Sequence, residues 1–158
     1  MASEKQCAFF EKLYTEECAR EASLNAYSAG LLSLITLYSG LVLYVAEHGA
    51  TVHIETATAK LFYLLALMSM VIGFLFAMLA RQLAQYEALN DPDSVIAQYG
   101  DDPMQDDEFF DNRIADYRAA IVANTAVNNG KAAWLERATV CLGLSIFFHA
   151  LIFVFAIL

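Results

Sequence analysis

Three blocks of uncharged and mostly apolar residues stand out along the chain, at 29–46, 61–80 and 138–158. An α-helix rises 1.5 Å per residue, so about 20 such residues cross a hydrocarbon core of about 30 Å. The blocks have this length and are apolar on all faces, which a soluble fold of 158 residues cannot bury. The pattern predicts an all-α, polytopic membrane protein with three transmembrane helices.

The polar segments next to the first and third blocks carry helical patterns of their own. Residues 4–28 contain no Gly or Pro and place apolar residues at helical spacing, which predicts an amphipathic helix over 1–28 that runs into the first span. A second long helix is expected from Asp106 into the third span. Its apolar stripe consists of Phe110, Ile114, Tyr117 and Ile121.

Two asparagines follow this stripe. Asn124 takes the next position on the same face, and Asn128 lies four residues further, so both side chains share that face. Buried asparagines of this kind bond across helices and fix their register. The alternative is that both face solvent, and the sequence leaves the two interpretations open.

Basic residues predict the orientation of the spans. Of nine Lys and Arg residues, only Lys60 falls in the link 47–60 between the first two blocks. Because basic residues gather on the cytoplasmic side, we expect a multi-pass inner-membrane protein with a cytoplasmic N-terminus. The expected single membrane domain then has a cytoplasmic helix at 1–28, an external link at 47–60, and a cytoplasmic acidic loop and helix at 81–137.

Composition and charge argue against several kinds of partner and site. Hydrophobic residues make up 59% of the chain, and the formal net charge is −9. That charge argues against direct binding of nucleic acid, which needs clustered Lys and Arg. Three cysteines without a CxxC pair argue against a disulfide framework or a zinc site. The partners expected are the lipid bilayer and further copies of the chain.

No catalytic signature is present, so we expect neither an enzyme nor a bound cofactor or metal. Six carboxylates between 101 and 111 suggest a divalent cation, but their spacing does not match an EF-hand loop. A solvated loop and acidic helix start is the preferred interpretation. His48 and His53, in the link, do not share one helix face squarely.

Within the spans, a few polar and small residues are the candidates for function. His149 is the only histidine inside a span, where it would line a pore, sense protons, or bond a neighbouring helix as a neutral ring. Ser33 and Thr36 are candidate pore residues on the first span. Small residues that favour close helix packing in lipid form two ridges. These residues are Ser69, Gly73 and Ala77 on the second span, and Gly30 and Gly40 on the first.

Two segments share the plan of a polar helix that flows into a span, one from Phe9 and one from Arg113. The second starts with Tyr117-Arg118 and carries Leu-Glu-Arg-Ala at 135–138, just before the membrane. It resembles the juxtamembrane helix of SLATT-type bacterial effectors, small membrane proteins of antiphage defence systems. The resemblance covers about 45 residues, and the chain departs from it in having three spans instead of two. It implies an oligomeric pore or membrane-disrupting effector that a partner or ligand activates.

Two functions are therefore expected. The first is an oligomeric effector that forms a pore or perturbs the inner membrane in antiphage defence. The alternative is a membrane anchor or assembly subunit that recruits a soluble partner through its acidic cytoplasmic helices. A small transporter is disfavoured, because the spans contain no broken helices or paired internal charges.

Overall fold

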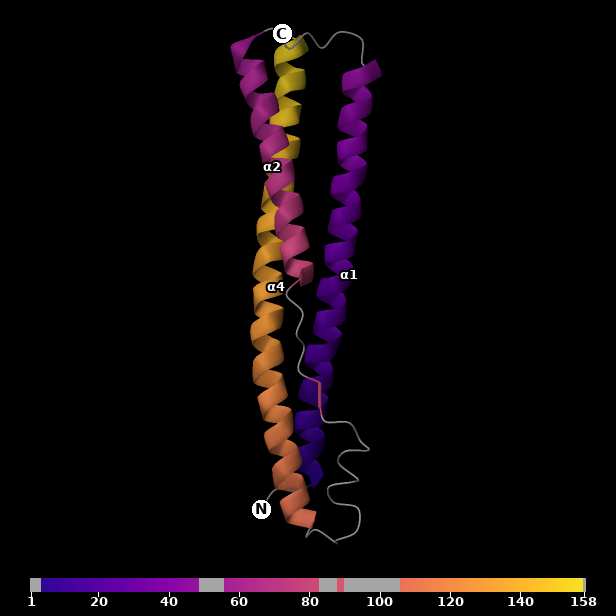
Figure 1. Cartoon of the computed structure of the whole chain (residues 1–158), viewed down its shortest axis with the longest axis vertical. Helices are drawn as coiled ribbons and strands as arrows, with labels where there is room; N and C mark the ends of the chain where they lie inside the picture. The colour runs from indigo at the N-terminus through magenta and orange to yellow at the C-terminus, as the bar shows by residue number, and fades with distance from the viewer. Residues whose placement is uncertain (1–3, 49–55, 83–87, 90–105, 158) are drawn as a thin grey trace. The chain divides into compact units, whose positions relative to one another are not determined.

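A computed structural model describes residues 4–48, 56–82, 88–89 and 106–157 (Figure 1). These residues form three α-helices: α1 (Glu4–His48), α2 (Ala57–Gln82) and α4 (Asp106–Ile157). The described ranges contain no β-strand. All three helices are long and apolar enough to cross a membrane, which confirms the predicted all-α fold with three spans.

α1 and α4 each contain a polar segment and an apolar segment, and neither helix breaks where one segment meets the other. α1 has 45 residues and α4 has 52, so at 1.5 Å per residue they reach about 68 and 78 Å. A hydrocarbon core of about 30 Å holds less than half of either helix. Gly130 does not interrupt α4, which stays helical on both sides of it.

The second helix begins earlier than the sequence indicated. Thr56 accepts a hydrogen bond at Oγ1 from the backbone N–H of Ala59, at 3.2 Å, so it caps the helix and α2 starts at Ala57 instead of position 61. The cap lies inside the expected link 47–60. Residues 49–55 of that link, the segment 90–105 and the final residue lie outside the described residues, and so do the predictions made for them.

Contacts divide the chain into two compact units. We call Asn25–Leu83 with Gly130–Leu158 the membrane unit, and Met1–Leu24 with Ala84–Asn129 the polar unit.

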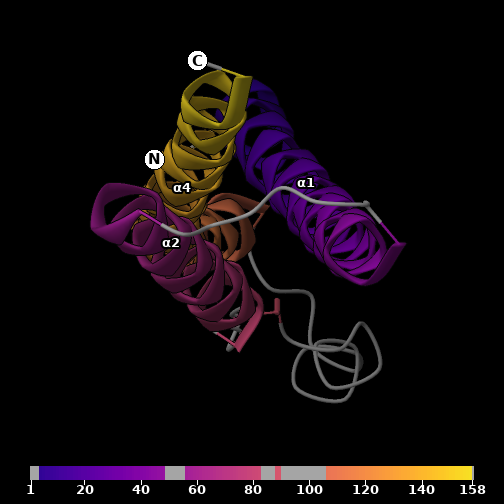
Figure 2. The ribbon, with the colours of Figure 1, turned by 90° about the horizontal axis from the view of Figure 1, so that it is seen from above.

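In the membrane unit, α4 lies beside both other helices (Figure 2). Its contacts with α1 advance in the same direction along both chains, from Tyr27 with Thr139 to Tyr38 with His149, so the two helices are parallel. Its contacts with α2 advance in opposite directions, from Phe76 with Trp134 to Phe62 with Phe148. α2 is therefore antiparallel to α4.

Buried positions in the membrane unit follow a seven-residue repeat. On α2, the buried residues seven apart are Ala59, Ala66, Gly73 and Ala80. On α4, the buried residues alternate at spacings of four and three: Lys131, Leu135, Ala138, Leu142 and Ser145. This repeat is the signature of left-handed knobs-into-holes packing, and the small residues of α2 let its backbone approach its neighbours closely.

The outer faces of the membrane unit are apolar and uncovered. In the most apolar window of α1 only 17% of residues are buried within the chain. Large side chains such as Leu37, Leu43 and Phe147 are mostly exposed. A surface of this kind on a soluble protein would aggregate, whereas in a bilayer it meets hydrocarbon.

In the polar unit, the described parts of α1 and α4 pack against each other along a single seam. The Tyr14 and Tyr117 rings lie 5.8 Å apart, and Tyr117 and Ala120 are buried. The apolar stripe predicted on α4 faces this seam. The buried face of α4 extends past the last apolar residue of this stripe, because Asn124 and Asn128 are fully buried on the same face.

The closest backbone approach tests this packing. A Cβ added at Gly73 would lie 3.1 Å from the Cys141 Cβ and 3.2 Å from the Ala138 carbonyl oxygen, whereas one added at Gly40 meets nothing within 4 Å. Gly73→Ala should therefore destabilise the fold by about 1–3 kcal/mol relative to Gly40→Ala, which carries the same gain in helix propensity. SDS-induced unfolding in mixed micelles measures the difference. Equal midpoints for the two variants would contradict the packing described here.

Candidate functional site

One layer of the membrane unit brings a ring from each helix together: Tyr38 of α1, Tyr63 of α2 and His149 of α4. The His149 ring centroid lies 5.6 Å from that of Tyr38 and 6.0 Å from that of Tyr63. Both tyrosine rings are close to perpendicular to the imidazole, at 90° and 89°. The heptad spacing of α4 places His149 on the buried seam, four residues after Ser145.

Hydrogen bonding at His149 is concentrated on one nitrogen. Nδ1 lies 2.8 Å from the Tyr38 hydroxyl and 3.0 Å from the Ser145 carbonyl oxygen. A bare Nδ1 accepts from the hydroxyl, while a protonated Nδ1 donates to the carbonyl, so these two partners favour different tautomers. The other nitrogen, Nε2, is buried and has no hydrogen-bond partner among the described residues.

Other polar side chains of the membrane unit find partners on neighbouring helices. The Ser28 hydroxyl donates to the Ala77 carbonyl oxygen at 3.2 Å, and Tyr27 bonds Thr139 at 2.9 Å. The ammonium group of Lys131, whose side chain is fully buried, donates to the Asn25 carbonyl oxygen Oδ1 at 3.2 Å. For the buried Ser28 and Lys131, such a bond removes the cost of an unpaired polar group in an apolar interior.

The candidate pore residues of α1 lie elsewhere. Ser33 and Thr36 are exposed on the outer face of the helix, and their hydroxyls donate to the carbonyls of Ala29 and Leu32. These bonds within the helix let both side chains face lipid without an unpaired donor. The structure thus does not bring Ser33 or Thr36 together with His149, which faces the interior.

The two small-residue ridges also differ in their surroundings. Gly73 and Ala77 of α2 are buried, and Ser69 is half-buried. Gly30 and Gly40 of α1 are exposed, with nothing within 4 Å of an added Cβ. Within this chain the α2 ridge is a packing surface, while the α1 ridge is uncovered.

Next to that ridge lies an open groove of about 520 Å³, which combines apolar and basic character. Its lining residues are Ala29, Leu32, Ser33, Thr36, Leu37 and Arg81. Arg81 is the last basic residue of α2 and marks the end of its uncharged run. A guanidinium at that level suits the boundary between hydrocarbon and headgroups.

Hydrogen bonds in the polar unit join α1 to α4 through Asn128. Its amide nitrogen donates to the Glu17 carboxylate at 2.8 Å and to the Glu17 backbone carbonyl at 3.1 Å. Arg20 donates to the Asn129 carbonyl oxygen Oδ1 at 2.8 Å and lies 3.5 Å from the Glu17 carboxylate. Of the two interpretations of the asparagine pair, the structure shows the buried one, in which Asn128 bonds across helices.

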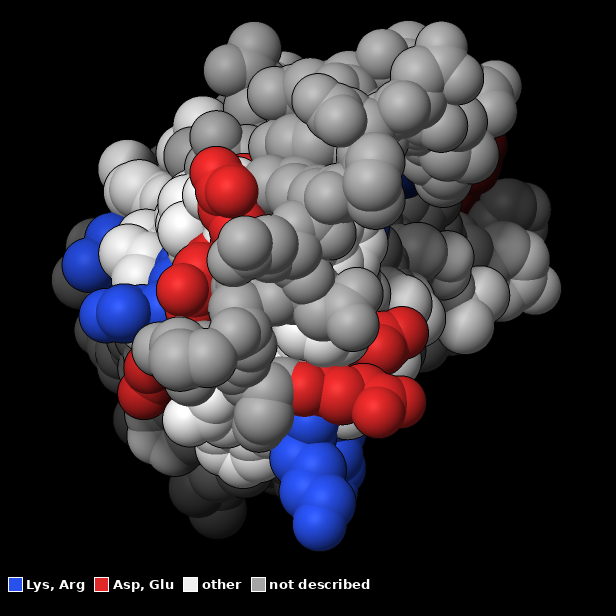
Figure 3. Space-filling model, turned by 90° about the horizontal axis from the view of Figure 1, so that it is seen from below, with Lys and Arg blue, Asp and Glu red and all other residues white. Residues whose placement is uncertain are grey.

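Charges on the polar unit are mixed. Seen from the end that carries the starts of α1 and α4, acidic and basic side chains are interspersed (Figure 3). Lys12 and Glu16 approach to 3.9 Å, as do Arg113 and Asp116. Both pairs lie within a single helix, and the Lys12–Glu16 pair is exposed, so neither pair joins α1 to α4.

Titratable groups near this seam are held in their neutral forms. Burial, followed by the negative charge of Glu11, raises the pKa of Cys7 and that of Tyr117. Burial also raises the pKa of Tyr14, beside Cys18. Cys7 is therefore a thiol at neutral pH, without the thiolate character of a nucleophile or metal ligand.

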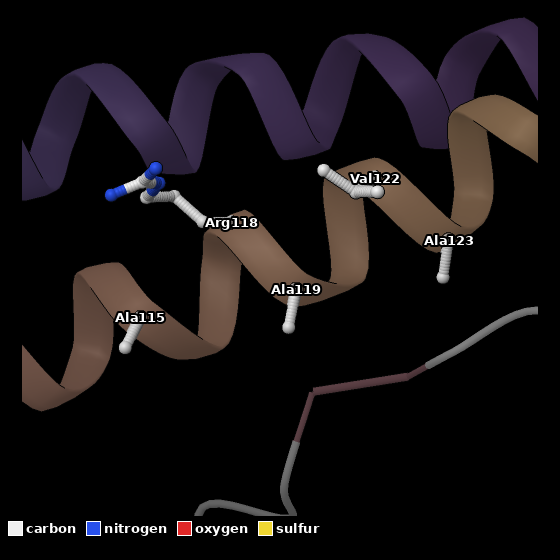
Figure 4. Close-up of a pocket in the computed structure, with 5 residues that line it drawn as sticks. All are labelled: Ala115, Arg118, Ala119, Val122 and Ala123. Atoms are coloured by element: carbon white, nitrogen blue, oxygen red, sulfur yellow. The ribbon is translucent and has the colours of Figure 1, made fainter.

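A second groove, of about 510 Å³, runs along α4 in the polar unit. It is lined by Ala115, Arg118, Ala119, Val122 and Ala123. The three alanines point in one direction from the helix, while Arg118 and Val122 project on another side (Figure 4). Small side chains one helical turn apart leave room for a second helix to approach closely.

The described ranges hold no cluster of three metal-ligating side chains. Of the acidic run at 101–111, Asp101 and Asp102 lie outside those ranges, and the structure describes the backbone alone of Asp106 and Asp107. His53 lies outside them as well, and the structure describes the backbone of His48 alone. Sequence analysis did not single out Tyr38, Tyr63, Lys131 or Glu17. Tyr38 and Glu17, which bond His149 and Asn128, both lie on α1, and the signal available for them was the seven-residue spacing, once polar residues are allowed on the seam.

Comparison of the chain with protein-family models, curated proteins and solved structures finds no match. The resemblance to SLATT-type effectors stays a prediction.

Loss of the Asn128 hydrogen bonds should weaken the packing of α1 against α4 in the polar unit. Asn128→Ala removes both contacts with Glu17 and leaves a void in the seam, which should cost about 1–3 kcal/mol. Asn129→Ala, at an exposed neighbouring position, should cost less than about 0.5 kcal/mol. Amide hydrogen exchange of α1 around Glu17 measures both effects. Faster exchange in the Asn129 variant than in the Asn128 variant would show that the buried bonds do not hold this pairing.

Proposed function

We propose that the chain is an oligomeric effector that forms a pore in, or perturbs, the bacterial inner membrane, as part of antiphage defence. The supporting observation is the uncovered outer face of α1, where Gly30, Ser33, Thr36 and Gly40 lie inside an otherwise apolar span. Small and hydroxyl-bearing residues on one face are the usual contact surface between helices in lipid. A second copy of the chain is the partner that this face suits.

The polar residues on this face of α1 would line the pore of such an oligomer. When several α1 helices pack around an axis, Ser33 and Thr36 supply the only side-chain hydroxyls of this outer face within the span's central turns. Hydroxyls that line a pore stabilise water and ions, which an all-leucine lining excludes. Assembly and permeability are therefore tied to one helix face in this proposal.

The defence context rests on the resemblance of the α4 juxtamembrane segment to SLATT-type effectors, in which an activated partner or ligand triggers the membrane protein. The orientation rests on the distribution of basic residues, with the N-terminus and the polar unit in the cytoplasm. There the polar unit is available to a soluble activator.

The groove at Ala115, Ala119 and Ala123 favours the alternative function, a membrane anchor that recruits a soluble partner. It lies in the unit expected to face the cytoplasm, and acidic residues such as Glu108 and Asp111 are exposed near the start of the same helix. A basic amphipathic helix would match both the small-residue groove and these charges. In this alternative the chain stays monomeric in the bilayer.

Purified chain in sealed liposomes separates the two functions. We expect concentration-dependent release of trapped K⁺ when the wild-type chain is reconstituted, with a steep dependence that reports assembly. Gly40→Leu should block close approach at the α1 face and lower the flux at least about tenfold. Gly143→Leu is the matched control, because Gly143 is an equally open glycine on α4.

Liposomes that stay sealed at every protein density and membrane potential, with a chain that sediments as a monomer in detergent, would contradict the pore and favour the anchor. Equal loss of flux in the Gly40 and Gly143 variants would contradict the assignment of the assembly surface to α1.

A further inference from the structure

The layer of Tyr38, Tyr63 and His149 has a chemistry that the packing of three apolar helices does not require. Leucine or alanine at these positions would fill the seam without any polar group to satisfy. Instead, three different helices each direct a polar aromatic side chain to one point, midway along the third span. An ionisable side chain at that depth is costly in lipid and points to a functional role.

Two buried polar atoms of this layer, Nε2 of His149 and Oγ of Ser145, form no hydrogen bond with the described residues. In either neutral tautomer of His149, Nδ1 has a hydrogen-bond partner: it accepts from the Tyr38 hydroxyl or donates to the Ser145 carbonyl oxygen. Nε2 has no hydrogen-bond partner among the described residues. The hydroxyl oxygen of Ser145, a fully buried residue one turn away on the same face, likewise lacks a partner. Buried groups left without partners in this way usually mark a site for a small polar species.

The same layer offers a protonated His149 ring a hydrogen-bond acceptor and two neighbouring aromatic rings. An imidazolium donates from both nitrogens, and the Ser145 carbonyl oxygen already lies 3.0 Å from Nδ1. Aromatic rings within about 6 Å attract a cation, and the two tyrosines lie within or at that distance. Both act in an interior of low dielectric constant, where such contacts are stronger than in water.

The groups around the ring carry no opposing charge. The titratable residue that faces His149 from α1 is Tyr38, and the one from α2 is Tyr63. On α4 itself the neighbour one turn away is Ser145. In the described parts of the three helices, no Lys, Arg, Asp or Glu forms an ion pair with the ring.

We propose that Tyr38, Tyr63, Ser145 and His149 form a proton-binding site at the centre of the membrane unit. A hydronium ion gives its proton to the bare Nε2 of the tautomer that carries its hydrogen on Nδ1, and the water molecule that is left accepts the hydrogen bond of Nε2–H. The ring gains one positive charge, Nδ1–H donates to the Ser145 carbonyl oxygen, and the Tyr38 hydroxyl oxygen faces Nδ1 as an acceptor. The Tyr63 ring, whose centroid lies 6.0 Å from that of the imidazole, attracts the cation.

The experiment reads protonation directly. The full-length chain is labelled with ¹⁵N-histidine and reconstituted in lipid bilayers, with His48→Gln and His53→Gln so that His149 is the single imidazole of the three histidines. Solid-state NMR shifts of the two ring nitrogens distinguish both neutral tautomers from the imidazolium. We expect one protonation step of the ring within the pH range in which the chain keeps its helices, together with polarisation transfer from water to the ring.

Paired variants at Tyr63 isolate the aromatic contribution. Tyr63→Leu removes the ring and should lower the proton affinity of His149 at least about threefold, whereas Tyr63→Phe keeps the ring face and should leave it unchanged. Tyr63→Met, which is closer in volume, replaces the leucine variant if circular dichroism shows that the latter has lost helix.

A ring that stays neutral at every pH at which the chain keeps its helices would overturn the site. Equal proton affinity in the Tyr63→Phe and Tyr63→Leu or Tyr63→Met variants would overturn the role of the tyrosine. Because the measurement reports proton binding and not flux, its outcome is independent of whether the chain conducts ions.

Discussion

Hydrocarbon offers no hydrogen-bond partner, and this constraint explains where each polar side chain of the membrane unit lies. Ser33 and Thr36 face outward because each donates to a carbonyl of its own helix. Ser28 and His149 turn inward, where another helix supplies the partner. The outer surface is thus left to apolar side chains, and the interior holds polar contacts that specify which helix faces meet. A polar seam of this kind stabilises one register more than an apolar seam of the same volume would.

Small residues on α2 make these contacts possible. Polar bonds act over about 3 Å, so the helix backbones must be close before Ser28 can reach the Ala77 carbonyl oxygen. Ala66, Gly73 and Ala80 provide that approach at every second turn of the helix. Along α4 the same seven-residue repeat continues through the polar unit, where Asn124 and Asn128 occupy it. In the polar unit this face of α4 carries amide groups, and in the membrane unit it carries apolar side chains together with Ser145 and His149.

The spans and the long helices were predictable because the charge-free runs and the lack of Gly and Pro act locally. The start of α2 was missed because it depends on a single capping hydroxyl, Thr56. The site was predictable only in part. His149 stood out as an ionisable group within a span, but its partners Tyr38 and Tyr63 look like ordinary interface or lipid-facing tyrosines until the relative rotation of three helices is known. Lys131 entered the sequence analysis only as one of the basic residues that predict orientation, because no local pattern reveals that its ammonium group donates to Asn25 of another helix.

Lipid as the solvent of the apolar helix faces is the central claim, and two nearly equally exposed side chains test it most directly. Leu37 of α1 is 73% exposed and Val122 of α4 is 72% exposed, but the first lies in a span and the second in the polar unit. Each is replaced by a spin-labelled cysteine, in bilayers, with the three native cysteines changed to alanine. We expect the label at 37 to collide with dissolved oxygen and to be shielded from a water-soluble nickel chelate, and the label at 122 to show the reverse. Free access of the nickel chelate to position 37 would contradict the membrane fold.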